Sequence, residues 1–313
     1  MGDIMLATPL IRCLKKKYPD SRIDFLVRKN FVQVLAGNPY IDNLLVYESD
    51  FFHIVKKIKA AGYDYIINIH CSFLSNLICL FSGSKVLRYK DYFIHRFLLV
   101  EFGLNLYREK IPVFKRYMSA ARRIGVEYDG QGLDFFLPNS VAESLHGESG
   151  EKYMGICPVA VWNTKRWPSE NFVGLAKLAA EKRSARVLIF GGKKDYDYCE
   201  NIRKEIDGDT INLCGIDINE SAAYLKKCKI LVTNDTGLMH VARALKIPVA
   251  ALFGPTVEEF GFFPEGADAK IFQKKLSCRP CSTKGSKKCP LGTFLCMKGI
   301  SVEEVFQYCA SYL

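Results

Sequence analysis

Residues 231–240 carry the clearest chemistry in the sequence. They read Leu-Val-Thr-Asn-Asp-Thr-Gly-Leu-Met-His, an apolar strand that ends at Thr233 and is followed by a helix. Asp235 or Thr236 can cap that helix, and the free N–H groups of its first turn point at whatever fills the adjoining cleft. Gly237 lets a ligand approach the backbone closely. The pattern predicts an anion cradle without a P-loop lysine; the alternative is a well-capped helix whose glycine serves packing.

Three further segments should lie near this cradle, because the loops after parallel strands meet at one edge of a sheet. Gly191-Gly192 and residues 253–256 (Phe-Gly-Pro-Thr) each end a strand with bare backbone. Residues 164–168 (Thr-Lys-Arg-Trp-Pro) offer two adjacent cations, and a lysine there can neutralise a pyrophosphate leaving group. The combination favours a nucleotide diphosphate. Since neither GxGxxG nor a P-loop motif occurs, a conventional dinucleotide-binding enzyme or P-loop NTPase is disfavoured.

Short apolar runs alternate with amphipathic segments along nearly the whole chain, which is the βαβ rhythm of a parallel sheet. Strands are expected at 22–27, 44–47, 65–69, 85–89, 153–157, 186–190, 210–213, 230–233 and 249–253. Helices are expected at 7–17, 51–61, 73–81, 169–182, 195–206, 219–227 and 238–246. A polar, glycine-bearing linker is expected at 147–152. The sequence therefore predicts two doubly wound α/β domains.

The composition is that of an ordinary globular protein. The chain has 313 residues, 49% hydrophobic and 25% charged, so disordered and fibrous proteins are excluded. We find no apolar run of about 18 residues, and the first residues do not read as a secretory signal. We therefore expect a cytoplasmic protein, in which the 12 cysteines stay mostly reduced.

The net charge of +11 gathers in two stretches. Residues 85–123 hold ten basic and three acidic side chains among many aromatic ones, and residues 270–298 hold eight basic and no acidic side chains. Basic residues mixed with apolar ones suit an anionic membrane surface better than a duplex groove. A solvated face over a core helix is the alternative for the first stretch. Neither stretch carries a nucleic-acid motif, so no nucleic-acid partner is expected.

Four motifs occur in the order found in one known family. They are Gly2-Asp3-Ile4-Met5-Leu6-Ala7-Thr8-Pro9, residues 164–168, residues 235–240 and residues 253–256. Together they resemble glycosyltransferase family 9, the ADP-heptose:lipopolysaccharide heptosyltransferase family, over essentially the whole chain. The resemblance implies the GT-B architecture, with two Rossmann-like domains facing a central cleft. The acceptor-binding domain would be 1–148, and the nucleotide-sugar-binding domain, with a Cys-rich tail and a final helix, would be 149–313.

The resemblance also implies a reaction, the inverting and metal-independent transfer of a heptose from ADP-heptose to the inner core of lipopolysaccharide. Asp3 matches the general base, a role that suits a carboxylate within hydrogen-bond reach of the acceptor hydroxyl. The alternative for Asp3 is a helix N-terminal acid that faces the helix dipole. Lys165 matches the lysine that contacts the donor diphosphate and stabilises charge as ADP leaves.

Other positions follow from the same comparison of motifs. Asp235 matches an acid near the donor sugar, and His240 matches a family histidine, although a packed helix histidine fits equally well. The phosphate-cradling backbone corresponds to Thr236, Gly237 and Leu238. Further donor contacts are expected at Gly191, Gly192, Cys214 and Gly215. Acceptor phosphate or carboxylate contacts are expected at Arg88, Lys90 and Arg96, within the basic and aromatic stretch.

The sequence begins inside its first motif. The resemblance places a first β-strand and a loop before Gly2-Asp3, so the first strand of the N-terminal domain is missing here. A misassigned start, a truncated sequence or an impaired copy would each explain this. We expect an extension that supplies an apolar strand to restore stability and activity.

Four cysteines lie within 19 residues, at Cys278, Cys281, Cys289 and Cys296. The opening Cys-x-x-Cys has metal-ligand spacing, and four thiolates are a suitable zinc shell. The second pair matches no standard zinc-ribbon spacing, so structural thiols or redox-labile pairs are the alternative. No cofactor is expected to be needed for catalysis.

The leading hypothesis is a heptosyltransferase that is cytoplasmic and peripheral to the inner face of the cytoplasmic membrane. Its partners would be ADP-heptose or another nucleotide sugar, an anionic glycolipid acceptor (the lipid A-Kdo core) and the inner-membrane surface. One alternative is a family member that uses another nucleotide sugar for a different envelope glycan. Another is a non-catalytic relative that binds nucleotides or glycolipids.

Overall fold

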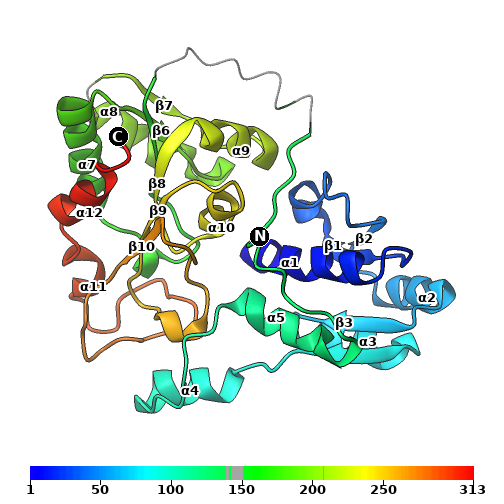
Figure 1. Cartoon of the computed structure of the whole chain (residues 1–313). Helices are drawn as coiled ribbons and strands as arrows, with labels where there is room; N and C mark the ends of the chain where they lie inside the picture. The colour runs from blue at the N-terminus through cyan, green and yellow to red at the C-terminus, as the bar shows by residue number, and fades with distance from the viewer. Residues whose placement is uncertain (139–140, 142–150, 207) are drawn as a thin grey trace. The chain divides into compact units, whose positions relative to one another are not determined.

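The computed structural model describes residues 1–138, 141, 151–206 and 208–313 (Figure 1). The chain divides into two compact units. Unit 1 contains Asp3–Tyr92 and Ile111–Phe136, together with Met1, and unit 2 contains Phe93–Lys110 and Leu137–Leu313, together with Gly2. The predicted domain boundary at 148/149 and most of the predicted linker at 147–152 lie outside the described residues.

Unit 1 is built from short parallel strand pairs and helices. β1 (Asp24–Arg28) pairs with β2 (Asn43–Tyr47), and β3 (Tyr65–Asn68) pairs with β4 (Lys85–Arg88), as two separate sheets in the described part of the chain. The helices are α1 (Gly2–Lys17), η1 (Lys29–Val34), α2 (Phe51–Ala61), α3 (Phe73–Ser82), α5 (Val113–Ala121) and η2 (Arg122–Ile124). All four strands expected in this half are present.

Local sequence signals explain two of these helices. The Asp50 side chain accepts a hydrogen bond from His53 N and so caps α2, which ends where Gly62 takes a left-handed conformation with φ of 64°. α3 is bounded in the same way by Ser72 and Gly83. The inner faces of both helices pack on β2 through a buried cluster of Leu45, Ile54, Ile58 and Ile78. This aliphatic cluster joins α2 and α3 to β2.

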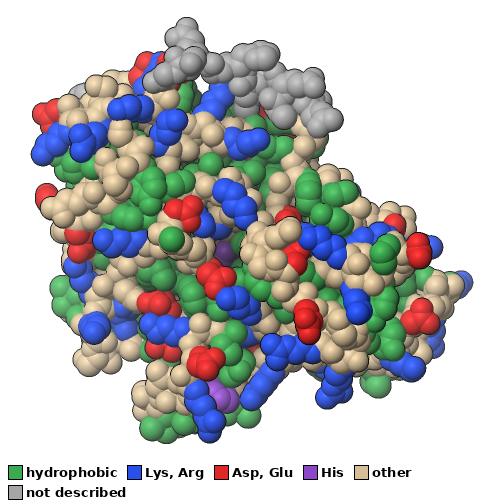
Figure 2. All heavy atoms as spheres, in the orientation of Figure 1, with side chains coloured by type: hydrophobic (Ala, Val, Ile, Leu, Met, Phe, Trp, Pro, Cys, Tyr) green, Lys and Arg blue, Asp and Glu red, His purple; other side chains and the backbone are tan. Residues whose placement is uncertain are grey.

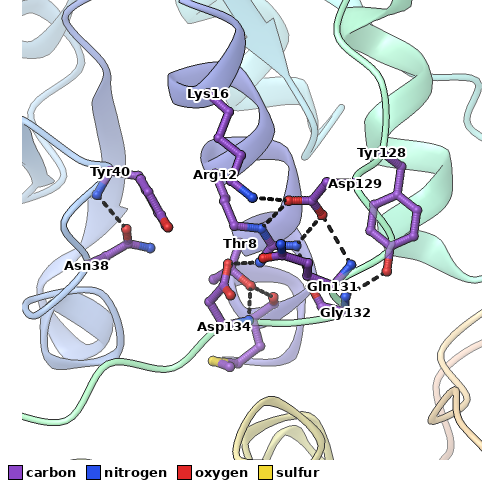
Figure 3. Close-up of polar contacts among 11 residues, drawn as sticks. Thr8, Arg12, Lys16, Asn38, Tyr40, Tyr128, Asp129, Gln131, Gly132 and Asp134 are labelled. Carbon is purple, nitrogen blue, oxygen red and sulfur yellow. Dashed lines mark hydrogen bonds and ion pairs between the residues drawn. The ribbon is translucent and has the colours of Figure 1, made fainter. Parts of the chain in front are cut away.

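A buried guanidinium fixes α1 to the segment 128–134 (Figure 3). Only 1% of the Arg12 side chain is exposed, and its Nε and Nη2 donate to the two carboxylate oxygens of Asp129 at 2.9 and 2.8 Å. Arg12 also donates to Asp134 and to the carbonyl of Gly132. The backbone N–H of Asp134 in turn donates to Thr8 Oγ1 at 2.9 Å. These contacts fix the orientation of the helix whose first turn carries Asp3.

Unit 2 is a doubly wound sheet of six parallel strands in the order β10-β9-β8-β5-β6-β7. The strands are β5 (Tyr153–Cys157), β6 (Arg186–Ile189), β7 (Thr210–Asn212), β8 (Cys228–Asn234), β9 (Val249–Leu252) and β10 (Ala269–Phe272). Its central strands are apolar and fully buried, as for Ile156, Val232 and Ala250. Strands buried on both faces need continuous apolar runs, which is why the sequence marked them.

Helices cover both faces of this sheet (Figure 1). α7 (Ser169–Arg183) contacts α8 (Tyr196–Glu205) and α12 (Val302–Cys309), whereas α9 (Ile218–Lys227) contacts α10 (Gly237–Ala244) on the other face. Short turns complete the unit at η3 (Asn163–Lys165), η4 (Lys193–Asp195), η5 (Glu258–Phe260) and α11 (Leu295–Lys298). The carboxyl ends of the strands therefore share one edge, where the predicted donor loops emerge.

The segment 93–110 clusters with unit 2 and contains α4 (Phe93–Phe102). Leu99 is the one residue of α4 that is buried, while Phe93, Ile94 and Phe97 are 46–66% exposed. Over α4, Figure 2 shows hydrophobic and basic side chains beside one another. None of the helices in the described ranges is both long and apolar enough to span a membrane.

Candidate functional site

A buried amide ties three loops together at the carboxyl edge of the unit 2 sheet. Asn234 ends β8, and its Oδ1 accepts a hydrogen bond from the backbone N–H of Trp167 at 3.0 Å. Its Nδ2 donates to the carbonyls of Cys157 and Val159, both at 3.4 Å. Since every polar atom of this fully buried side chain has a partner, the amide specifies the loop arrangement rather than weakening the core. Asn234 was not among the site residues predicted from the sequence, although its neighbour Asp235 was.

The adjacent residues form a charged cluster. Lys165 Nζ lies 2.5 Å from Asp235 Oδ2, and Thr256 Oγ1 donates to the same oxygen at 2.9 Å. The two charged side chains are only 14% and 9% exposed. The structure thus brings together two predicted site residues, from the loops after β5 and β8, with a hydroxyl from the loop after β9. Thr256 belongs to the motif at residues 253–256, in which only the bare backbone was predicted to matter. Its hydroxyl was not predicted.

The helix that follows this cluster is capped differently from the expectation. α10 begins at Gly237 with Thr236 as its N-cap, and within the described structure no side-chain hydrogen bond caps its first turn. The Asp235 carboxylate instead bonds Lys165 and Thr256, and the Thr236 hydroxyl lies 3.3 Å from that of Thr233. An N-terminus without a side-chain cap keeps its positive dipole end and its N–H groups for an anion. Lys165 adds a full positive charge beside it.

The glycine loops after β6 and β7 contact each other at the edge of the sheet. Gly215 N donates to the Gly191 carbonyl at 3.1 Å, and a Cβ on Gly191 would lie 2.6 Å from Cys214 Sγ. Gly191 is therefore needed for close packing against Cys214. Gly192 N donates to Asp195 Oδ2 at 3.3 Å. Gly191, Cys214 and Gly215 thus form one compact structure at the sheet edge.

The remaining donor-side predictions have different environments. Leu238 and His240 are buried in α10. Arg166, the cation next to Lys165, donates twice to the Ala160 carbonyl at 2.9–3.0 Å and pairs with Asp195 at 3.3 Å. Arg166 therefore holds its own loop. Of the two adjacent cations, Lys165 is the one placed beside α10.

In unit 1, the predicted base lies in a helix rather than before one. α1 starts at Gly2, five residues earlier than expected, so Asp3 sits in its first turn and is exposed. The hydroxyl of Tyr117 on α5 donates to Asp3 Oδ1 at 3.4 Å. Burial, followed by the nearby Asp3 carboxylate, raises the pKa of Tyr117 well above its ordinary value, so the phenol stays a hydrogen-bond donor. No sequence signal singled out Tyr117 within its aromatic stretch.

The predicted acceptor residues are divided between the two units, with Arg88 and Lys90 in unit 1 and Arg96 in unit 2. Arg88 ends β4 and is exposed, and Lys90 lies over the Tyr92 ring at 5.4 Å. Arg116, a buried residue of α5 that was not predicted, also lies over the Tyr92 ring, with its guanidinium carbon 4.6 Å from the ring centroid. Arg96 lies on α4, in unit 2.

The four clustered cysteines are free thiols. Cys278, Cys281 and Cys289 are half-buried and Cys296 is buried. Backbone N–H groups, that of Phe294 first, lower the pKa of the Cys289 thiol. In the part of the chain that the structure describes, no three His, Cys, Asp or Glu side chains are set to hold a metal ion. The zinc interpretation stays a prediction.

Comparisons with known proteins give the family. The family model for glycosyltransferase family 9 (heptosyltransferase) matches residues 51–291, well over half of the chain. Lipooligosaccharide heptosyltransferase 2 of Campylobacter jejuni subsp. jejuni serotype O:2 is 25% identical over 324 residues, which cover 100% of this chain and 95% of the relative.

Solved structures show the same fold. The glycosyl transferase family 9 protein from Veillonella parvula DSM 2008 superposes with a TM-score of 0.80 at 23% identity, over 99% of this chain and 94% of the other. E. coli ADP-heptose lps heptosyltransferase II gives a TM-score of 0.74 at 23% identity, over 99% and 95%. These similarities confirm the predicted α/β fold class of GT-B type, and the family match confirms the predicted enzyme class. The chain belongs to glycosyltransferase family 9, the heptosyltransferases.

Proposed function

We propose that this enzyme transfers a heptose from ADP-heptose to the inner core of lipopolysaccharide, with inversion at the anomeric carbon and without a metal ion. The observation that carries the proposal is the Lys165–Asp235 pair at the N-terminus of α10, in a chain of this family. The relatives named above support the donor and acceptor, since their names are lipooligosaccharide and ADP-heptose lps heptosyltransferases.

The donor end of the reaction needs positive charge. When the glycosidic bond to ADP breaks, its electron pair leaves with the diphosphate, whose negative charge grows. Lys165 and the first-turn N–H groups of α10 are suited to offset that charge. Their partial burial strengthens the interaction, because water screens it less. Asp235 keeps the ammonium in place until the diphosphate oxygens share it.

The acceptor end needs a base. We assign this role to Asp3, whose carboxylate would take the proton of the attacking sugar hydroxyl as the new C–O bond forms. The attack occurs on the face opposite the departing ADP, so one displacement inverts the anomeric carbon. The Tyr117 hydroxyl holds the carboxylate by its 3.4 Å hydrogen bond.

Metal independence follows from the same chemistry. In the proposal, Lys165 and the α10 N-terminus neutralise the charge of the leaving diphosphate, which a divalent cation does in many sites that bind nucleoside phosphates. Turnover that is unchanged by EDTA is the expected result. Turnover that EDTA abolishes and Mg²⁺ or Mn²⁺ restores would contradict this part of the proposal.

The enzyme also needs access to a lipid-anchored acceptor. The segment 93–110 offers exposed aromatic and aliphatic side chains on α4 beside Arg96, within the basic stretch 85–123. An amphipathic segment within a basic stretch is suited to the headgroup region of an anionic bilayer. We therefore propose that the enzyme is cytoplasmic and acts as a peripheral protein at the inner face of the cytoplasmic membrane.

A thermal-shift panel of ADP-, UDP-, GDP- and CDP-sugars tests the donor assignment. A ligand at 100 times its Kd stabilises the native state by about 2.7 kcal/mol, which raises Tm measurably. We expect ADP-heptose to raise Tm selectively. If no nucleotide sugar raises Tm, the proposed donor site is rejected. If a UDP-sugar raises Tm selectively, ADP-heptose is rejected as the donor.

A further inference from the structure

One segment outside the predicted donor site touches two of the loops that form it. We call residues Cys278–Ser286 the clamp segment. It follows β10 in the chain and lies in the second basic stretch. Its contacts reach the loop after β5, which carries Lys165, and the loop after β9, which carries Thr256.

Arg279 makes the contacts at one end of the clamp segment. Its half-buried guanidinium donates to the carbonyl of Thr256 at 2.7 Å and to the carbonyl of Gly254. The same group donates to the Lys274 carbonyl and to Gln273 Oε1, the latter at 3.0 Å. The Cys281 backbone N–H adds a hydrogen bond to the Pro255 carbonyl at 3.2 Å. Consecutive carbonyls of residues 254–256 therefore all accept from the clamp segment.

The other end of the clamp segment holds the lysine loop. Thr164 Oγ1 donates to the Ser286 carbonyl at 3.0 Å and accepts from Ser286 N at 2.8 Å. Thr164 N also donates to the Ser286 carbonyl at 3.2 Å. A Cβ on Gly285 would lie 2.7 Å from the Trp162 side chain, so the two segments are in close contact there. Thr164 directly precedes Lys165.

We propose that Arg279 is a positioning residue for the donor-diphosphate site, which it serves by holding residues 254–256 so that the Thr256 hydroxyl bonds Asp235. This inference rests on the proposed function. The path is short: the guanidinium fixes the Thr256 backbone, the Thr256 hydroxyl donates to Asp235 at 2.9 Å, and Asp235 pairs with Lys165 at 2.5 Å. Arg279 touches neither Asp235 nor Lys165 in any of these contacts.

The chemistry of arginine suits this task. A guanidinium has five donors in a rigid plane, so one side chain can bond several carbonyls at fixed relative angles. Arg279 uses this capacity on four acceptors, three of which are backbone carbonyls. A lysine ammonium is a flexible point donor and would hold fewer of them at once. Replacement by lysine is therefore expected to rescue only part of the function.

The test combines kinetics, calorimetry and a double-mutant cycle on the whole chain. The variants are Arg279→Gln, Arg279→Lys, Thr256→Val and the pair Arg279→Gln with Thr256→Val. Lys287→Gln, an exposed lysine one residue beyond the clamp segment, is the matched control. ADP is the calorimetric probe, ADP-heptose with the acceptor glycolipid gives kcat and KM, and thermal unfolding gives Tm.

We expect Arg279→Gln to weaken ADP binding and to lower kcat/KM by roughly 10- to 100-fold, because hydrogen bonds to a charged group are lost. Arg279→Lys should recover part of this loss, and Lys287→Gln should change nothing. If Arg279 acts through Thr256, the Gln substitution has a much smaller effect in the Thr256→Val background than in the wild type. Should Arg279→Gln fold poorly, the lysine variant is paired with Thr256→Val in its place.

Three results would overturn the proposal by different routes. If Arg279→Gln and Arg279→Lys lower Tm but leave ADP affinity and kcat/KM unchanged, Arg279 is only structural. Additive effects of the Arg279 and Thr256 substitutions would likewise reject the path through Thr256. Wild-type protein that does not bind ADP would instead overturn the proposed function, and with it the role of Arg279.

Discussion

The ammonium of Lys165 lies 2.5 Å from the carboxylate of Asp235, although 70 residues separate them in the chain. Asp235 directly precedes Thr236, the N-cap of α10, so the pair places a cation at the positive end of that helix. Without the carboxylate, the Lys165 ammonium and the positive end of the α10 dipole would repel each other. Asp235 therefore holds the Lys165 ammonium beside the N-terminus of α10.

Replacing Lys165 by Met should lower kcat by roughly 100- to 1,000-fold, the loss found when one charge-stabilising donor is removed from an active site. ADP affinity should fall as well, because the leaving group loses its cation. Lys194→Met, at an exposed lysine after the glycine loop, is the control. Steady-state kinetics with ADP-heptose checks both variants, and equal losses in the two would contradict the special role of Lys165.

Arg12 should be the most costly cation to remove from unit 1. Arg12→Met leaves two carboxylates without their buried partner, which costs about 3–5 kcal/mol of unfolding free energy. Arg22, which is 63% exposed and pairs with Asp24, offers the matched control. Arg22→Met should cost no more than about 1 kcal/mol. Urea unfolding measures the loss of unfolding free energy in each variant. Equal losses would contradict the structural role given to Arg12.

The same network predicts a pH dependence. The hydrogen bonds from Arg12, with those from Lys16 and Gln131, hold the pKa of Asp129 well below its usual range. A carboxyl with a folded-state pKa below its unfolded value stabilises the fold fully above that unfolded value, about 3.9, and loses this contribution as the pH falls further. The stability gap between wild type and Asp129→Asn should therefore narrow below about pH 4. A gap that stays constant from pH 7 to pH 3 would contradict the prediction.

Tyr117→Phe should separate catalysis from folding. The substitution keeps the ring and deletes the hydroxyl that donates to Asp3. We expect kcat to fall about 3- to 10-fold, the worth of one hydrogen bond, with the donor KM and Tm nearly unchanged. Tyr128→Phe removes a hydroxyl that accepts from Gly132 N elsewhere in unit 1. It should lower Tm but leave kcat unaltered. A fall in Tm without a fall in kcat for Tyr117→Phe would show a structural role only.

The membrane proposal predicts a composition-dependent association. Replacing Phe93, Ile94 and Phe97 together by serine should abolish flotation with phosphatidylglycerol vesicles, because the exposed apolar area on α4 is lost. Leu291→Ser, at another exposed apolar residue, should leave flotation intact. Wild-type protein that does not float with anionic vesicles, or that floats equally with neutral ones, would contradict the proposal that α4 binds an anionic membrane surface.

Much of unit 2 could be predicted because its signals are local. Strands buried on both faces need continuous apolar runs, and Asp217 caps α9 with a capping box that reaches Glu220. α4 and α5 were not predicted, because both contain aromatic and β-branched residues, which form helices only weakly. The burial of Arg12 could not be foreseen either, because its carboxylate partners lie 117 and 122 residues away.

The residues of the candidate site likewise divide into those that the sequence predicts and those that it does not. Lys165, Asp235 and Gly191 follow strands of one parallel sheet, so the topology alone brings their loops to one edge. Thr256, Tyr117 and Arg279 act through side-chain contacts to residues far away in the chain or in other loops, which no local sequence signal indicates. Of the two cap candidates, Thr236 occupies the N-cap position without a side-chain hydrogen bond, and the Asp235 carboxylate bonds Lys165 and Thr256 instead.

The role of Asp3 as the base is tested most directly by product formation by Asp3→Asn from ADP-heptose and the acceptor glycolipid, measured beside ADP affinity. The amide keeps the shape of the side chain and its bond to Tyr117, but it cannot take a proton. We expect kcat to fall about 100- to 10,000-fold, as for removal of a general base, with ADP affinity unchanged. Turnover by Asp3→Asn at the wild-type rate would contradict this role.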